Sequence, residues 1–119
     1  MRVKIEVSGI NEVRRKLGIK AAEGLGDALD IDVGVETRKM ANKGADNAPV
    51  ETGALKASIR YSTRRDGKMK WHFGSYLPYA LRQEYEHKTK NAYLRRAYFG
   101  GHKPAAEEFK LTIQRRLGG

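Results

Sequence analysis

One long helix dominates what this chain can fold into. Between Ala21 and Asn47, small and apolar residues recur at the three- and four-residue spacing of a helix face. Four glycines in this stretch lower its intrinsic helix stability by up to about 1 kcal/mol each relative to alanine, so packing must hold the helix. Because proline disfavours helical geometry at the residue before it, we predict that the helix ends at Ala48, next to Pro49.

Alternating residues predict strands on both sides of this helix. Val3, Ile5 and Val7 alternate with charged residues, which indicates a half-buried strand. Asn11 is predicted to cap a short helix that ends at Gly18.

A β-hairpin is predicted over 59–73. Apolar residues alternate on either side of the segment 65–67, whose Gly67 suits a three-residue loop. This loop pairs Arg64 with Lys68. It also sets Tyr61 opposite Trp71 and Ile59 opposite Phe73, with the apolar face packed beneath the long helix.

The C-terminal third is predicted to be helical. Short helices are expected over 78–85 and 91–98, the second closed by Gly100-Gly101. The last helix is expected over Pro104–Leu117, with a buried stripe of Ala106, Phe109, Ile113 and Leu117. Residues 1–119 are thus predicted to form one α+β domain, in which a small antiparallel sheet packs against a long helix and a C-terminal helix.

Positive charge gathers in the second half of the chain. The net charge is +10, and residues 60–119 hold 14 basic against 5 acidic side chains, compared with 10 and 9 in residues 1–59. In the predicted hairpin, basic side chains lie across from one another, which is costly unless an anion covers them. The face would therefore meet DNA or an acidic protein surface, or else be an ordinary solvated surface. Its candidate residues are Arg60, Arg64, Arg65, Lys68 and Lys70.

Residues for catalysis or metal binding do not form a recognisable pattern. The chain has no cysteine, and its three histidines are far apart in the sequence, so neither a metal site nor a cofactor is predicted. Glu84 and Glu86 lack a histidine network, and Ser58 and Ser62 lack a nucleophile motif. Because no catalytic pattern is present, we do not expect an enzyme. No apolar run is long enough to span a bilayer, so we expect no membrane partner.

The stretch 48–59 reads Ala-Pro-Val-Glu-Thr-Gly-Ala-Leu-Lys-Ala-Ser-Ile. It resembles the signature of the tail-completion, or head–tail joining, family of long-tailed bacteriophages. In that family the signature comes after a long helix and typically reads Ala-Pro-Val-acidic-Thr-Gly-x-Leu-basic-x-Ser-Ile. Weaker similarities lie at 8–13, 79–85 and 91–97. The chain departs from the family at Glu86, where glycine is usual, and at 93–96, where a proline and a phenylalanine are usual.

The signature has structural roles as well. Any corner between a helix and a strand needs three things, and the signature has all of them. A proline ends the preceding helix, a threonine caps one helical turn over 53–56, and a glycine allows backbone conformations that other residues avoid. The two aliphatic residues after them are predicted to lie in the core. These motif residues are Pro49, Thr52, Gly53, Leu55 and Ile59.

The resemblance implies a non-enzymatic virion protein, made and assembled in the host bacterium's cytoplasm. Such a subunit would form a homo-oligomeric ring, a hexamer by the symmetry of the tail, between tail-tube or terminator proteins and the head connector, and DNA would pass through it. Ring contacts are expected from Glu86, His87, Lys88, Tyr93, Tyr98 and Phe99, although the last two could equally be core residues. The alternative function is a free, basic nucleic-acid-binding module. It is supported by the charge but has no recognisable nucleic-acid motif.

Overall fold

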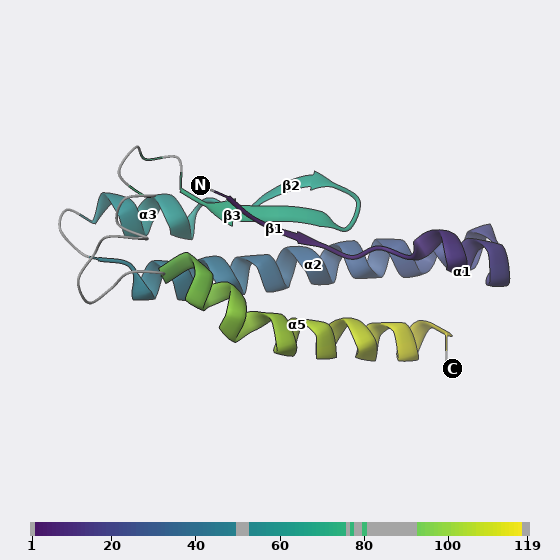
Figure 1. Ribbon diagram of the computed structural model, residues 1–119. Coiled ribbons are helices and arrows are strands. Elements are labelled where there is room, and N and C mark those ends of the chain that lie inside the picture. The colour runs from purple at the N-terminus through teal and green to yellow at the C-terminus, as the bar shows by residue number, and fades with distance from the viewer. Residues whose placement is uncertain (1, 50–52, 76, 78–79, 81–92, 118–119) are drawn as a thin grey trace.

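The computed structural model describes residues 2–49, 53–75, 77, 80 and 93–117, and it has the predicted α+β architecture. Helix α2 is its spine, with the sheet along one side, α5 running beside it, and α1 and α3 near opposite ends (Figure 1). The sheet is antiparallel with strand order β1-β3-β2. The elements are β1 (Arg2–Glu6), α1 (Ile10–Leu17), α2 (Ile19–Asn47), α3 (Ala54–Arg60), β2 (Arg64–Gly67), β3 (Lys70–Gly74) and α5 (Tyr93–Leu117).

The long helix agrees closely with its prediction. Helix α2 ends at Asn47, and Ala48 before the proline is extended with φ −73° and ψ 152°. Gly18 separates it from α1, as expected. The predicted cap of α1 is wrong: Gly9 holds that position without a side-chain bond, and Asn11 lies inside the helix.

Helix α2 comes very close to the sheet at Gly34. A Cβ atom added there would lie 2.8 Å from the Trp71 ring, below the closest approach that real Cβ atoms make. The absent side chain therefore lets the half-buried indole lie directly on the helix backbone. This explains why a residue of poor helix propensity occupies the middle of the longest helix.

Replacing Gly34 with alanine is expected to destabilise the protein by about 1–3 kcal/mol, because the indole must move out of a packed position. Gly100→Ala is the matched control. It also lies inside a helix, but an added Cβ there would meet nothing within 4 Å. The control should gain up to about 1 kcal/mol from helix propensity. Thermal melts of both variants measure this, and a stabilised Gly34 variant would contradict the close approach.

The helical turn predicted over 53–56 is longer than expected and includes Ile59, where the hairpin was expected to begin. Gly53 has φ 81° and precedes α3, which continues to Arg60 instead of stopping after one turn. Leu55 and Ile59 are buried, as predicted, because residues four apart share one helix face. Thr52 lies outside the described residues.

The hairpin forms, but its predicted register is wrong. Strand β2 covers only Arg64–Gly67, and the turn lies at Lys68-Met69. Arg64 pairs with His72 and Arg65 with Trp71, and an irregularity follows before Gly67. Tyr61 therefore has no strand partner and is 73% exposed, so its predicted core position is also wrong.

The two predicted helices at the C-terminus are one. Helix α5 runs through Gly100-Gly101 and Pro104, and Figure 1 shows that it changes direction along its length. Gly101 does not end the helix, because its Cα lies against Met40 of α2, where an added Cβ would be 2.8 Å from Cγ. The predicted stripe is partly wrong. Ala105 and Thr112 are buried, whereas Ala106, Ile113 and Leu117 are exposed. The helix predicted over 78–85 lies almost entirely outside the described residues.

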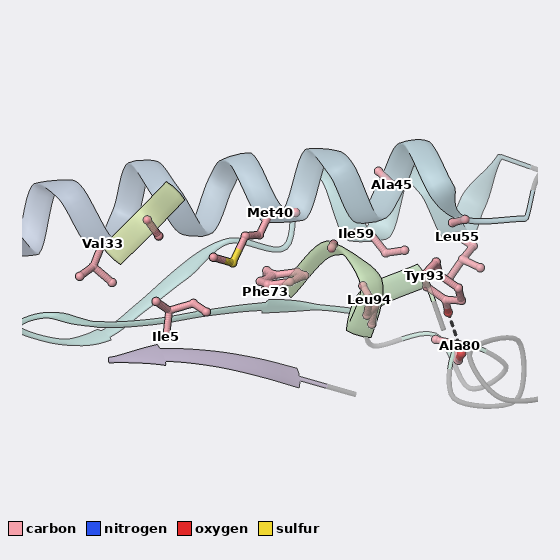
Figure 2. Packing of buried hydrophobic residues seen from close by; sticks show 14 of the residues in the cluster. Ile5, Val33, Met40, Ala45, Leu55, Ile59, Phe73, Ala80, Tyr93 and Leu94 are labelled. Atoms are coloured by element: carbon pink, nitrogen blue, oxygen red, sulfur yellow. Dashed lines mark hydrogen bonds between the residues drawn. The ribbon is translucent and has the colours of Figure 1, made fainter. Parts of the chain in front are cut away.

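The core lies between α2 and the elements that flank it. Figure 2 shows Phe73 pointing from β3 toward α2, with Leu94 of α5 beside the same helix. Tyr93 is fully buried at the start of α5, and its hydroxyl donates a 2.7 Å hydrogen bond to the Ala80 carbonyl (Figure 2). The sheet, α3 and α5 therefore share a single core.

Candidate functional site

The five basic residues predicted for the hairpin face do not share a face. Arg60 belongs to α3, Arg64 and Arg65 to β2, Lys68 to the turn and Lys70 to β3. Neighbours along β2 point to opposite sides of the sheet, because side chains alternate along a strand. The single basic surface predicted from the sequence is thus divided among α3, the two hairpin strands and the turn between them.

Four of these five cations are paired with carboxylates. Asp27 and Asp30 on α2 take two of them, Glu6 on β1 takes a third, and Asp46 near the end of α2 takes the fourth. The pairs are Lys68 with Asp27 at 2.9 Å, Arg65 with Asp30 at 3.0 Å, Lys70 with Glu6 at 3.7 Å and Arg60 with Asp46 at 2.8 Å. Most of the anions expected to cover these cations are therefore supplied within the chain, by acids of α2 and β1.

Asp30 holds the hairpin turn against α2. Its Oδ1 accepts hydrogen bonds from the Met69 backbone N–H at 2.7 Å and from the Trp71 indole N–H at 3.1 Å. The Arg65 guanidinium donates to its Oδ2 at 3.0 Å. Met69 has φ 63°, a left-handed conformation that costs a non-glycine residue about 1–2 kcal/mol. The bond to its N–H helps to hold that turn.

Two of these carboxyl groups have lowered pKa values. Burial alone would raise the pKa of Asp30, but the hydrogen bonds from Met69, Trp71 and Arg65 outweigh it and hold that pKa below its ordinary value. The hydrogen bond from Arg60 lowers the pKa of exposed Asp46. Asp30 therefore stays ionised in mild acid.

The predicted ring-contact residues differ in exposure. Tyr93 is buried, so in this structure it is a core residue and its assignment to a surface contact is wrong. Tyr98 is half-buried against the core, whereas Phe99 is 66% exposed. Their rings meet edge to face, with centroids 5.4 Å apart. Glu86, His87 and Lys88 lie outside the described residues.

Large apolar side chains are exposed on both long helices. On α2, Ile31 and Val35 are 66% and 48% exposed and lie one turn apart on the same face. Leu111, Ile113 and Leu117 are exposed toward the end of α5. We call Ile31 and Val35 the uncovered face of α2. The sequence analysis did not single out these two residues, because they lie outside the helical spacing on which the helix prediction rested.

Ser58, Ser62 and His72 all have partners that serve the fold. The Ser58 hydroxyl donates to the Leu55 carbonyl, and Ser62 Oγ donates to the Ile59 carbonyl. His72 Nδ1 lies 2.8 Å from Asp66. In the described part of the chain, no group of three or more acidic, histidine or cysteine side chains could hold a metal ion. No described helix is both long and apolar enough to cross a membrane.

The chain was compared with known proteins in three ways. Neither protein-family models, nor curated proteins, nor solved structures gave a match.

Proposed function

We propose that this chain is a structural subunit of a tailed-phage virion. In this role it forms a homo-oligomeric ring, a hexamer, at the joint between head and tail, with tail-tube or terminator proteins on one side and the head connector on the other. The signature at 48–59 supports the family, and the described α+β fold is compatible with it. DNA would pass through the ring without base-specific contacts.

The observation that carries the proposal is apolar surface on an elongated molecule. The radius of gyration is 16.3 Å and the extents are 51 × 21 × 18 Å, whereas a compact domain of this length would have a radius near 13.5 Å. An elongated subunit buries less of its own apolar surface. The uncovered face of α2 supplies large aliphatic groups that a neighbouring subunit can bury.

The charge distribution favours this role over the free nucleic-acid-binding module. Most of the predicted hairpin cations already have carboxylate partners within the chain. They are less available to phosphates than the sequence alone suggested. Of the three aromatic residues predicted to lie on the buried hairpin face, only Tyr61 is strongly exposed, and a single ring is not a stacking platform for successive bases.

Changing Ile31 and Val35 together to lysine is expected to abolish self-association while leaving the fold intact, because both side chains are exposed. Sedimentation velocity and negative-stain imaging measure the assemblies. The charge-matched control places two lysines at exposed polar positions, Asn11 and Gln114. If the control loses assembly to the same degree, added charge and not the uncovered face is responsible.

The virion role is tested by deleting the gene from the phage genome that carries it. Electron microscopy of the lysate should show filled heads and separate tails, and a plasmid copy of the gene should restore joining. Full, infectious, tailed particles in the absence of the protein would contradict the proposal. Antibody labelling of intact particles should mark the neck.

A further inference from the structure

A groove lies where α3 meets the end of the sheet at which β1 begins and β3 ends. Its volume is about 780 Å³, within the range of ligand-binding pockets. One wall comes from α3 and its C-terminal cap, and the other from the sheet. Its lining includes Ala54, Ala57 and Tyr61 on the helix side and Arg2, Arg64 and His72 on the sheet side. Of these residues, only Arg64 was a candidate for meeting an anion in the sequence analysis.

The sheet side of this groove is positively charged. Arg2 of β1 and Arg64 of β2 line it, and Lys4 shares their sheet face next to His72 of β3, whose Nδ1 lies 2.8 Å from the Asp66 carboxylate. Among the described residues, no carboxylate is within ion-pair distance of Arg2, Lys4 or Arg64. Cations that share one sheet face without a carboxylate partner repel one another, so an anion between Arg2 and Arg64 would be stabilising.

Arg64 is positioned to bind such an anion. Its Nη1 donates to the Tyr61 carbonyl at 2.9 Å and to the Thr63 carbonyl at 2.8 Å. These two bonds fix the plane of the guanidinium. A guanidinium has five N–H donors, so three remain for a ligand. A fixed planar donor suits the paired oxygens of a carboxylate.

The serine hydroxyl groups of the groove serve the fold. Ser62 Oγ accepts from the Gly74 N–H at 2.9 Å, in addition to its bond to the Ile59 carbonyl. Ser58 Oγ and Ser75 Oγ are 2.6 Å apart. Ligand selection therefore falls to the arginines, with the alanines and the exposed Tyr61 ring offering apolar contact.

We infer that this groove binds an acidic peptide segment, whose carboxylates meet Arg2 and Arg64 and whose small apolar side chains lie against Ala54 and Ala57. A polyphosphate backbone fits less well, because Glu6 and Asp66 occupy the same sheet face and limit the positive surface to one end. The inference does not depend on the head–tail role.

The test uses the full chain and a labelled peptide, Gly-Asp-Leu-Asp-Ala-Asp-Leu, in fluorescence anisotropy at near-physiological salt. Ala57→Glu should weaken binding by at least about tenfold, because its carboxylate competes for the arginines. Ala57→Gln has nearly the same shape and should stay within about threefold of the wild type. Both replace an exposed helix residue, and circular dichroism checks that each variant folds.

Removing the arginines gives a second, independent test. Arg2→Ala combined with Arg64→Ala should weaken binding at least about tenfold, whereas the charge-matched pair Arg38→Ala with Lys103→Ala should have little effect. The all-asparagine version of the peptide should bind far more weakly than the acidic one. No measurable binding of the acidic peptide, or equal losses in both double variants, would overturn the inference. Tighter binding of an oligothymidylate than of the peptide, lost in the same variants, would also overturn it and assign the groove to nucleic acid.

Discussion

Phe73→Ala is expected to lower the free energy of unfolding by about 3–5 kcal/mol. The side chain is completely buried between β3 and α2, so the truncation loses its transfer free energy and leaves a cavity. Such a loss is a large part of the 5–15 kcal/mol that typically stabilises a domain. Urea unfolding followed by the fluorescence of the single tryptophan, Trp71, measures it.

Tyr61→Ala is the control for this prediction. The sequence placed both aromatics on one buried hairpin face, but the structure leaves Tyr61 73% exposed after the end of α3. Its removal should change stability by no more than about 0.5 kcal/mol. Similar losses in the two variants would favour the register predicted from the sequence over the one described above.

Asp30→Ala is expected to cost about 3 kcal/mol, on the scale of one or two hydrogen bonds to a charged group. The change leaves the Met69 N–H and the Trp71 indole N–H without their acceptor and the Arg65 guanidinium without its carboxylate. Chemical denaturation near pH 7 measures the loss. Asp27→Ala is the matched control, because Asp27 pairs with Lys68 but is 73% exposed. Exposed pairs contribute about 0–1 kcal/mol, so a loss in the control as large as that of Asp30→Ala would contradict the special role of Asp30.

The same carboxylate should make stability depend on acid pH. Because the folded-state pKa of Asp30 lies below its ordinary value of 3.8, the folded protein binds this proton less readily than the unfolded chain does. The contribution of Asp30 to the free energy of unfolding is therefore complete at pH values above its ordinary pKa. That contribution is lost as the pH falls through the lowered pKa of the folded state. Thermal melts between about pH 5 and pH 2 should show a steeper loss for the wild type than for Asp30→Ala. Parallel curves would show that Asp30 does not contribute in this way.

Local patterns were enough to predict the spine of the fold. The helical spacing from Ala21 to Asn47 extends over many turns, and Pro49 gives its end an unambiguous chemical cause. The first strand was equally clear, because three aliphatic residues alternate with charged ones. Ile59 belonged to two patterns at once, since it lies four residues after Leu55 and two before Tyr61. Burial against α2 decided in favour of the helix.

Contacts distant in sequence account for what the sequence did not predict. The hairpin turn forms at Met69 with a positive φ, and the acceptor for its N–H lies 39 residues earlier, on α2. Gly101 reads as a helix break, but it allows α5 to approach Met40. The acids that pair with the hairpin cations likewise lie on other elements, α2 and β1. The groove depends on α3 lying beside the sheet, a placement that required the correct secondary structure first.

The strand order β1-β3-β2 also bears on aggregation. In the described part of the chain both outer strands have an open edge, and such edges can pair with strands of other molecules. Here β1 carries a charge at Arg2, Lys4 and Glu6, and β2 has three consecutive charged residues, 64–66. Adding a second molecule's strand to either edge would crowd or desolvate these charges. Amyloid-like growth through the sheet is thus disfavoured, and helix surfaces remain the lower-cost route for one copy to meet another.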